Sequence, residues 1–347
     1  MSVLDKVLTL RPGNAVARLG AGSRLPLLNP RELLRALEGV PVALPCVPVL
    51  AKAALPGLLR AARTEDAVLG LACPHPMADR GAPERFVTAV RDVTADADAE
   101  HSRPVFLQAG PIRLTKTDGA SLEAFQDGLF RVVDAGFSLV SLDVSRLPAA
   151  EAVEAVKAVV GPVLERELAL EVTVPEAGEA GLADAARTLL SELTRAKVPV
   201  YLLRVSAAAL GEGEPDVALL RGLVDVATEF GAGVAVGEVA GSQRLLPTYV
   251  AAGARKVDCS GPFERLALGA WPAEAREQVR RKAEGAGLTA GELLSVLEEQ
   301  LPPLEAPARE RLEAFSFMEA TDVLTALGAA GTGWRAMTWL AEHKGGE

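Results

Sequence analysis

Four carboxylates and one guanidinium stand at or near the ends of short apolar runs in this sequence. Asp143, Glu171, Glu238 and Asp258 carry the carboxylates, and Arg204 carries the guanidinium. Carboxylates that meet in a partly dry site raise one another's pKa, which suits acid and base catalysis near neutral pH. In a catalytic interpretation, Asp143, Glu171 and Glu238 exchange protons and Arg204 grips a substrate carboxylate.

Two other interpretations of these carboxylates remain open. A divalent metal that prefers oxygen ligands, such as magnesium or manganese, would neutralise the carboxylates that Arg204 leaves unpaired. Alternatively, the carboxylates cap loops and pair with Arg204, Arg113 and Lys116 in a structural ion-pair network. We expect a site without a cofactor, with a divalent metal as the alternative.

Further polar residues occupy equivalent positions and are typical of a ligand site. Strand alternation places Glu171 and Thr173 on one face. The glycine-rich turn after Glu238 offers backbone N–H groups and the hydroxyl of Ser242. The predicted ligand-binding residues are Gln108, Ser145, Thr173, Arg204, Ser242, Asp258 and Ser260.

Histidine is scarce, which limits the chemistry that this chain offers. The sequence has His75, His101 and His343, and no histidine between residues 102 and 342. That long segment therefore supplies no histidine base and no histidine metal ligand. His75 lies in a Cys-Pro-His-Pro stretch, which is more typical of a rigid loop than of a ligand.

The three cysteines are far apart in sequence and do not form a disulfide framework. Cys46, Cys73 and Cys259 close neighbouring runs, so a thiolate-rich zinc site with His75 is a weak alternative. Free cysteine is more often a small buried hydrophobe.

Eight short apolar runs, each followed by an amphipathic helical stretch, must position these residues. Near-continuous apolar strands are typical of a parallel sheet that is buried on both faces. Eight such units predict an α/β fold, a (β/α)8 TIM barrel, in which chemistry sits at the C-terminal ends of the strands. An open doubly wound sheet is the alternative, although no Gly-x-Gly-x-x-Gly follows any run. The runs are Val40–Val47, Ala67–Cys73, Pro104–Ala109, Phe137–Val144, Leu168–Val174, Val198–Val205, Gly233–Val239 and Ala254–Ser260.

Helical segments flank the predicted barrel. Asn29-Pro30-Arg31-Glu32 is typical of a capped helix start, and we expect this helix to cover the bottom of the barrel. Four helical stretches follow Trp271, and they form either a small subdomain or a dimerisation element. The predicted division is residues 1–270 for the barrel with its N-terminal cap and residues 271–347 for a C-terminal helical extension.

The composition excludes several partners. The 347 residues carry a net charge of -10, which disfavours nucleic acids and anionic membrane surfaces. Neither a signal peptide nor a membrane-spanning run is visible, so we expect a cytoplasmic protein.

Three segments resemble the class II aldolase family. Asp134–Ser145 (DAGFSLVSLDVS) is similar to that family's strand-4 motif, and Ala251–Val257 to its lead into strand 8. Glu171–Pro175 (EVTVP), closing at Glu179, looks like strand 5 of the non-catalytic subunit of tagatose-1,6-bisphosphate aldolase. The resemblance implies an eight-stranded barrel.

The departures from that family are at its zinc site. The Asp-His-Gly that the resemblance implies after strand 3 is absent from Pro104–Pro111, and Thr173 stands at the glutamate ligand. The strand-7 histidine ligand corresponds to about Val236 or Gly237. Asp258 stands where the family grips phosphate with asparagine. Zinc polarisation of a carbonyl therefore does not carry over to this chain.

We accordingly expect an aldolase-like barrel that has lost the zinc site and acts as a non-catalytic or scaffolding subunit. Its expected partners are a catalytic subunit or other protein, a small sugar-like ligand and further copies of itself. The alternative is a lyase or aldolase of carbohydrate metabolism that uses magnesium, manganese or metal-free acid–base chemistry. A weaker idea makes the segment after Trp271 a helical docking surface.

Overall fold

The computed structural model describes residues 1–95, 101–175, 177, 181–211, 213–240, 243–286 and 288–344. Glu179 and Ser242, named above, lie outside the described residues.

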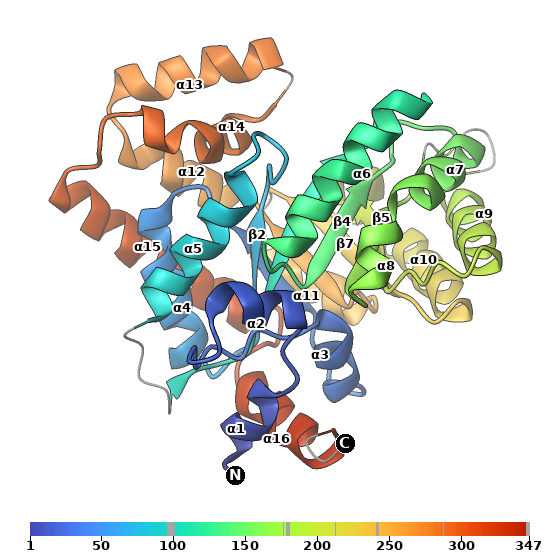
Figure 1. The fold of residues 1–347 in the computed structure, drawn as a ribbon, viewed down its shortest axis with the longest axis horizontal. Helices are drawn as coiled ribbons and strands as arrows, with labels where there is room; N and C mark the ends of the chain where they lie inside the picture. Colours follow the sequence, from blue (N-terminus) through green and yellow to red (C-terminus); the bar gives the residue numbers. More distant parts are fainter. Residues whose placement is uncertain are drawn as a thin grey trace.

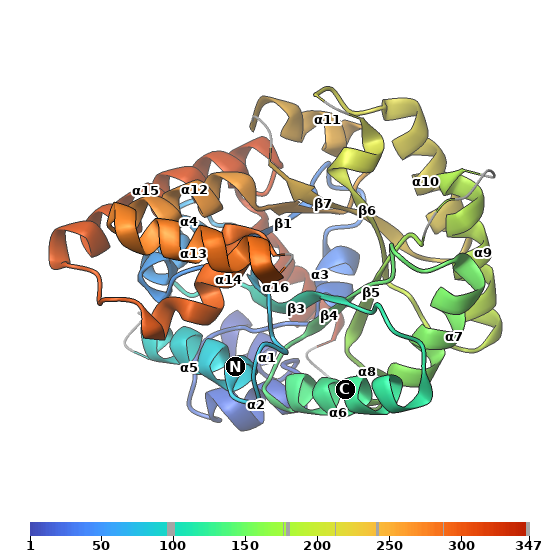
Figure 2. The ribbon, with the colours of Figure 1, turned by 90° about the horizontal axis from the view of Figure 1, so that it is seen from above.

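Eight parallel strands close into a barrel in sequence order, which confirms the predicted fold (Figures 1 and 2). The barrel closes where Leu44 to Cys46 of β1 pair with Lys256 to Asp258 of β8. The strands are β1 (Leu44–Pro48), β2 (Leu69–Cys73), β3 (Val105–Arg113), β4 (Leu139–Asp143), β5 (Ala169–Thr173), β6 (Leu202–Ser206), β7 (Gly233–Val239) and β8 (Lys256–Cys259).

The strands form because their side chains are apolar or β-branched and are buried on both faces. The barrel interior is filled with side chains. A Cβ on Gly70 would lie 2.2 Å from the ring of Phe106, so the glycine leaves space for that ring.

An outer layer of helices surrounds the barrel, each with an apolar face turned to the strands (Figure 1). These helices are α4 (Leu55–Thr64), α5 (Ala82–Thr94), α6 (Gly119–Asp134), α7 (Ala149–Val159), α8 (Gly161–Glu165), α9 (Leu182–Arg195), α10 (Val217–Glu229), α11 (Leu246–Ala251) and α12 (Gly261–Ala270). Short 3-10 turns cover Lys52–Ala54, Ala207–Leu210, Gln243–Leu245 and Glu298–Gln300.

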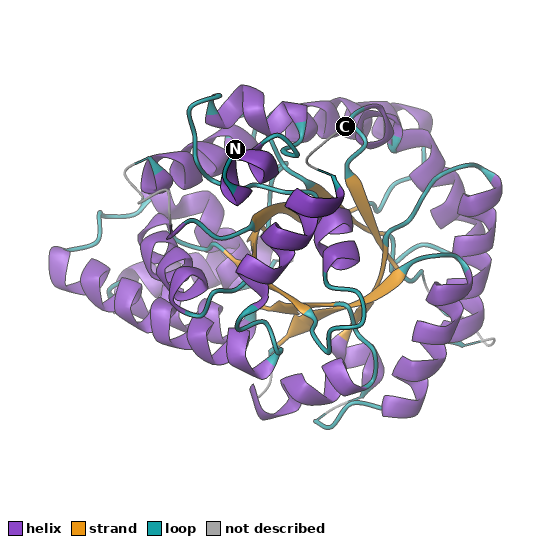
Figure 3. Ribbon diagram, turned by 90° about the horizontal axis from the view of Figure 1, so that it is seen from below, coloured by secondary structure: helices purple, strands orange, loops and turns teal. Residues whose placement is uncertain are grey.

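The bottom of the barrel is covered by helices from both ends of the chain (Figure 3). They are α1 (Val3–Leu8), α2 (Gly13–Leu19), α3 (Pro30–Ala36) and α16 (Thr332–His343). Asn29 caps α3 by accepting from the backbone N–H of Arg31 at 3.0 Å, as the sequence predicts. Lys344, just after α16, pairs with Glu32 of α3 at 2.6 Å and ties the C-terminal end to this layer.

The chain after Trp271 is spread over three places. Helices α13 (Ala273–Ala286) and α14 (Ala290–Leu297) lie above the C-terminal ends of the strands (Figure 1). Helix α15 (Ala306–Ala326) runs along the outside of the barrel against α4 and α12 (Figure 2). Helix α16 completes the bottom layer.

Among the described residues, no helix combines the length and the apolar character needed to cross a bilayer.

Candidate functional site

A buried ion-pair network lies inside the barrel below its C-terminal opening. Lys256 of β8 reaches across the barrel and donates to Glu171 of β5 at 2.8 Å and to Asp258 at 2.6 Å. The side chains of Lys256 and Glu171 are fully buried. Ser141 of β4 donates to the second oxygen of Glu171 at 2.6 Å.

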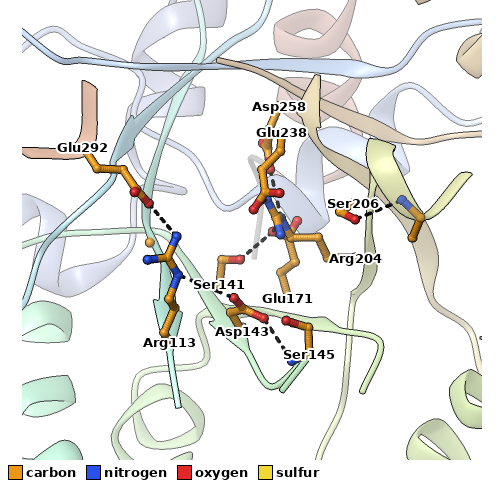
Figure 4. A network of polar contacts seen from close by, with 12 residues as sticks. Arg113, Ser141, Asp143, Ser145, Glu171, Arg204, Ser206, Glu238, Asp258 and Glu292 are labelled. Atoms are coloured by element: carbon orange, nitrogen blue, oxygen red, sulfur yellow. Dashed lines mark hydrogen bonds and ion pairs between the residues drawn. The ribbon is translucent and has the colours of Figure 1, made fainter. Parts of the chain in front are cut away.

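Arg204 of β6 provides the second cation of this network (Figure 4). Its Nε donates to Asp258 at 3.3 Å and lies 3.8 Å from Glu171, and its Nη2 reaches Glu238 at 3.4 Å. A Cβ on Gly237 would lie 2.2 Å from the guanidinium carbon, so a side chain there would displace Arg204.

The cations and carboxylates of this network neutralise one another. Each of the four oxygens of Glu171 and Asp258 accepts one hydrogen bond from Lys256, Arg204 or Ser141. Burial alone would raise the pKa of Asp258, but the charges of Lys256 and Arg204 outweigh it and lower that pKa. Burial would lower the pKa of Lys256, but Asp258 and Glu171 outweigh it and raise that pKa above its usual value. The buried layer is therefore two cations neutralised by two carboxylates.

Glu238 differs from these buried carboxylates. Its side chain is 54% exposed, and among the described residues it pairs only with Arg204, at 3.4 Å. Its φ of +59° is in the left-handed region, which non-glycine residues seldom adopt. This conformation holds the carboxylate at the wall of the opening.

A second group of charges lies at the rim, between the barrel and α14. Arg113 of β3 donates to Glu292 of α14 at 2.9 Å and lies 3.9 Å from Asp143 (Figure 4). Glu292 also accepts from the backbone N–H of Thr289, which caps α14. His75 Nε2 lies 3.8 Å from Glu292, and burial lowers the pKa of His75 despite that carboxylate. Glu292 thus ties the helix above the opening to the barrel.

Between the network and α14 lies a cavity of about 310 Å³. Its charged lining consists of Arg113 and Arg204 against four carboxylates: Glu238, Asp258, Glu264 and Glu292. The lining is Cys46, Pro48, Leu50, Ala72, Pro74, Gln108, Gly110, Pro111, Arg113, Arg204, Glu238, Ala240, Asp258, Ser260, Gly261, Glu264, Thr289 and Glu292.

The predicted site residues fall into three groups. Gln108, Arg204, Glu238, Asp258 and Ser260 line the cavity. Glu171 and Thr173 are buried on β5, and the hydroxyl oxygen of Thr173 has no hydrogen-bond partner among the described residues. Asp143 and Ser145 form the third group, at the rim, and neither lines the cavity. Asp143 accepts a hydrogen bond from the backbone N–H of Ser145, and Ser145 is exposed.

The cysteines are buried hydrophobic residues in this fold. Cys46, Cys73 and Cys259 are free and at most 7% exposed. Burial raises the pKa of Cys73 to about 12 and that of Cys46 well above its usual value. Cys46 donates to Gln108 at 3.4 Å. These thiols are therefore protonated at neutral pH, unlike metal-bound thiolates.

Lys256 was missed as a site residue. Its position is two residues before Asp258 in β8, so strand alternation alone places both side chains on the same face. The available signal was this spacing, with a lysine and an aspartate on the same face of one strand. Arg113 was expected as an ion-pair partner of the carboxylates, and it lies 3.9 Å from Asp143. Glu292 was not foreseen, because its pairing with Arg113 depends on where α14 folds.

The donor set does not fit the zinc of class II aldolases. Among the described ranges, no group of three or more His, Cys, Asp or Glu side chains is arranged to hold a metal ion. His75 is the one imidazole near the opening, and Glu171 and Asp258 are already bonded to Lys256 and Arg204.

Comparisons with known proteins reveal likeness in fold. No family model and no curated protein matches the sequence. The YdjI aldolase of Escherichia coli K12 is 13% identical, with 88% of this chain and 99% of that chain covered at a TM-score of 0.62. A putative fructose-1,6-bisphosphate aldolase of Coccidioides immitis is 16% identical, with 87% and 96% covered and a TM-score of 0.57. The fructose-bisphosphate aldolase of Campylobacter jejuni is 10% identical, with 87% and 94% covered and a TM-score of 0.60. The eight-stranded barrel fold is therefore shared with these structures.

Proposed function

We propose that this chain is a class II aldolase-like barrel that does not perform zinc-dependent aldol cleavage. In this proposal it holds a small sugar-like ligand in the cavity at the barrel mouth and acts as a non-catalytic or scaffolding subunit beside a catalytic partner. The aldolase barrels to which the chain is similar support the scaffold, and its own site residues support the altered role.

The observation that carries the proposal is the charge-neutral, buried ion-pair network of Lys256, Arg204, Glu171 and Asp258. A general base takes up a proton, and a metal ligand shares its charge with a metal cation. Glu171 and Asp258 instead neutralise Lys256 and Arg204, and each of their four oxygens accepts from one of these cations or from Ser141. Using either carboxylate would leave Lys256 or Arg204 as an uncompensated buried charge, which costs several kcal/mol, about 3–5.

The charge of the cavity favours an uncharged ligand. Two guanidiniums face four carboxylates in its lining, a net charge of -2, so a phosphate group would meet net repulsion. Hydroxyl groups both donate to carboxylates and accept from guanidiniums and amides. A polyol or unphosphorylated sugar therefore suits this lining.

Isothermal titration calorimetry with an unphosphorylated ketohexose, and with the same ketohexose carrying a phosphate, tests this proposal. We expect binding of the first and none of the second. Glu238→Gln should weaken binding, whereas Glu274→Gln, on the exposed surface of α13, should not. Preference for the phosphorylated sugar would contradict the proposal.

Glu238 favours one alternative, an enzyme that uses this carboxylate with magnesium, with manganese or without metal. A strained, half-exposed carboxylate beside a buried arginine is a feature that active sites often retain. This alternative predicts a turnover, or a rise in melting temperature with magnesium or manganese, that Glu238→Gln abolishes. A variant indistinguishable from the parent in both measurements would eliminate it.

A further inference from the structure

The outer face of α15 is an apolar stripe that the fold leaves open to solvent. Phe315 is 46% exposed and Met318 is 59% exposed. Few other large apolar side chains among the described residues are exposed to solvent. Arg311, Ala314 and Asp322 are exposed as well. These positions follow helical spacing and lie along one side of the helix. We define this set as the α15 stripe.

The opposite side of α15 is already buried within the chain. Leu312, Ala320, Val323 and Leu324 are buried there. Arg60 of α4 lies over the ring of Phe317, 4.7 Å from its centre. Packing inside the chain therefore explains the apolar residues on the inner face of α15. It does not explain the apolar residues on the outer face.

The charges of the stripe are also unused. The side chains of Arg311 and Asp322 make no hydrogen bond or ion pair with any other residue that the structure describes. Arg311 precedes Phe315 by four residues, and Asp322 follows Met318 by four residues. The stripe is therefore symmetric about the midpoint between Phe315 and Met318, with opposite charges at its two ends.

We propose that the α15 stripe binds a second copy of this chain through an antiparallel pair of α15 helices on a two-fold axis. A two-fold interface is self-complementary, because each residue i that meets j is matched by j meeting i. In this arrangement Phe315 of each copy meets Met318 of the other, and Arg311 of each copy meets Asp322 of the other. The helix spans about 30 Å, long enough for both contacts to form along one seam.

The charge pattern of the stripe favours an antiparallel pair of α15 helices over a parallel pair. A parallel pairing in the same register would place Arg311 against Arg311 and Asp322 against Asp322, and like charges repel. Only the antiparallel arrangement pairs every charge and places the two apolar side chains together.

Sedimentation velocity of the full chain, from about 1 to about 100 µM, tests the proposal. The parent should show a concentration-dependent dimer. Arg311→Asp alone and Asp322→Arg alone should each raise the dissociation constant at least about tenfold, because each creates two like-charge contacts. The double variant R311D/D322R exchanges the charges and should restore the dimer.

Matched variants separate this seam from general effects. Arg309→Asp changes the same charge two residues away, off the stripe, and Phe130→Ser removes an exposed aromatic side chain on α6. Both should leave the dimer intact, whereas F315S/M318S should give a monomer with an unchanged circular dichroism spectrum. A parent that stays monomeric, or an assembly that the stripe variants leave intact, would overturn the proposal.

Discussion

At the scale of residues, the central feature is an ammonium enclosed by carboxylates. Lys256 occupies a place in the barrel where an apolar side chain would be ordinary, and its charge is compensated by Glu171 and Asp258. Because the pKa of Lys256 is raised, its amine stays protonated and is not a nucleophile at neutral pH. Arg204 completes the compensation from the other side.

The sequence predicted Glu171, Arg204, Glu238 and Asp258 close together, because strand ends meet at one edge of a barrel. The prediction left Lys256 out, because it considered only the C-terminal ends of the strands. Lys256 is the first residue of β8 and lies deeper in the barrel. Which oxygen bonds to which cation depends on side-chain conformations inside the closed barrel, and no local pattern contains that information.

Removing the ammonium should be strongly destabilising. We expect Lys256→Met to lower the free energy of unfolding by about 3–5 kcal/mol, because Glu171 and Asp258 would lose a shared buried cation. Urea denaturation measures this loss. Lys157→Met removes a lysine whose pair with Glu154 is exposed, and it should change stability by less than about 1 kcal/mol. Equal effects of the two variants would contradict the structural role of Lys256.

At the scale of elements, most helices and all eight strands followed from apolar periodicity, caps and turn residues. The positions of α13, α14 and α15 did not follow, because an amphipathic pattern identifies a buried face without naming what covers it. Their sites depend on contacts distant in sequence, such as Glu292 with Arg113 and α15 with α4.

The contact of α15 with α4 depends on one glycine. A Cβ on Gly57 would lie 2.1 Å from the backbone oxygen of Glu313, so Gly57→Ala should force the helices apart and cost about 1–3 kcal/mol. Gly222→Ala in α10 meets nothing within 4 Å and should be neutral or stabilising by up to about 1 kcal/mol. Thermal and urea unfolding of both variants measure the difference. Equal stabilities would show that α15 does not pack this closely on α4.

At the scale of the whole molecule, the network links stability to pH. The folded pKa of Asp258 is below its usual 3.8, so its contribution is present above about pH 4 and is lost as pH falls through the folded value. The raised pKa of Lys256 places the loss of its contribution above its usual 10.5. Between these limits the contribution of the network should be constant.

The difference in unfolding free energy between the parent and Asp258→Asn should therefore be level from pH 5 to pH 9 and should shrink below pH 4. Asp225→Asn, at an exposed position of α10, should differ little from the parent at every pH. A difference for Asp258→Asn that grows toward acid would mean that Asp258 is not held ionised by Lys256 and Arg204.

The whole molecule joins an eight-stranded barrel to a buried layer in which Glu171 and Asp258 are paired with Lys256 and Arg204. We propose that this chain keeps the scaffold and has lost the zinc chemistry. A barrel of one fold carries many chemistries, and its site residues set the activity.

The most direct measurement is the rate of aldol cleavage of ketohexose bisphosphates by the purified chain, with added zinc and with a chelator. We expect no cleavage above the protein-free rate under either condition. Zinc-dependent turnover that the chelator abolishes would contradict it.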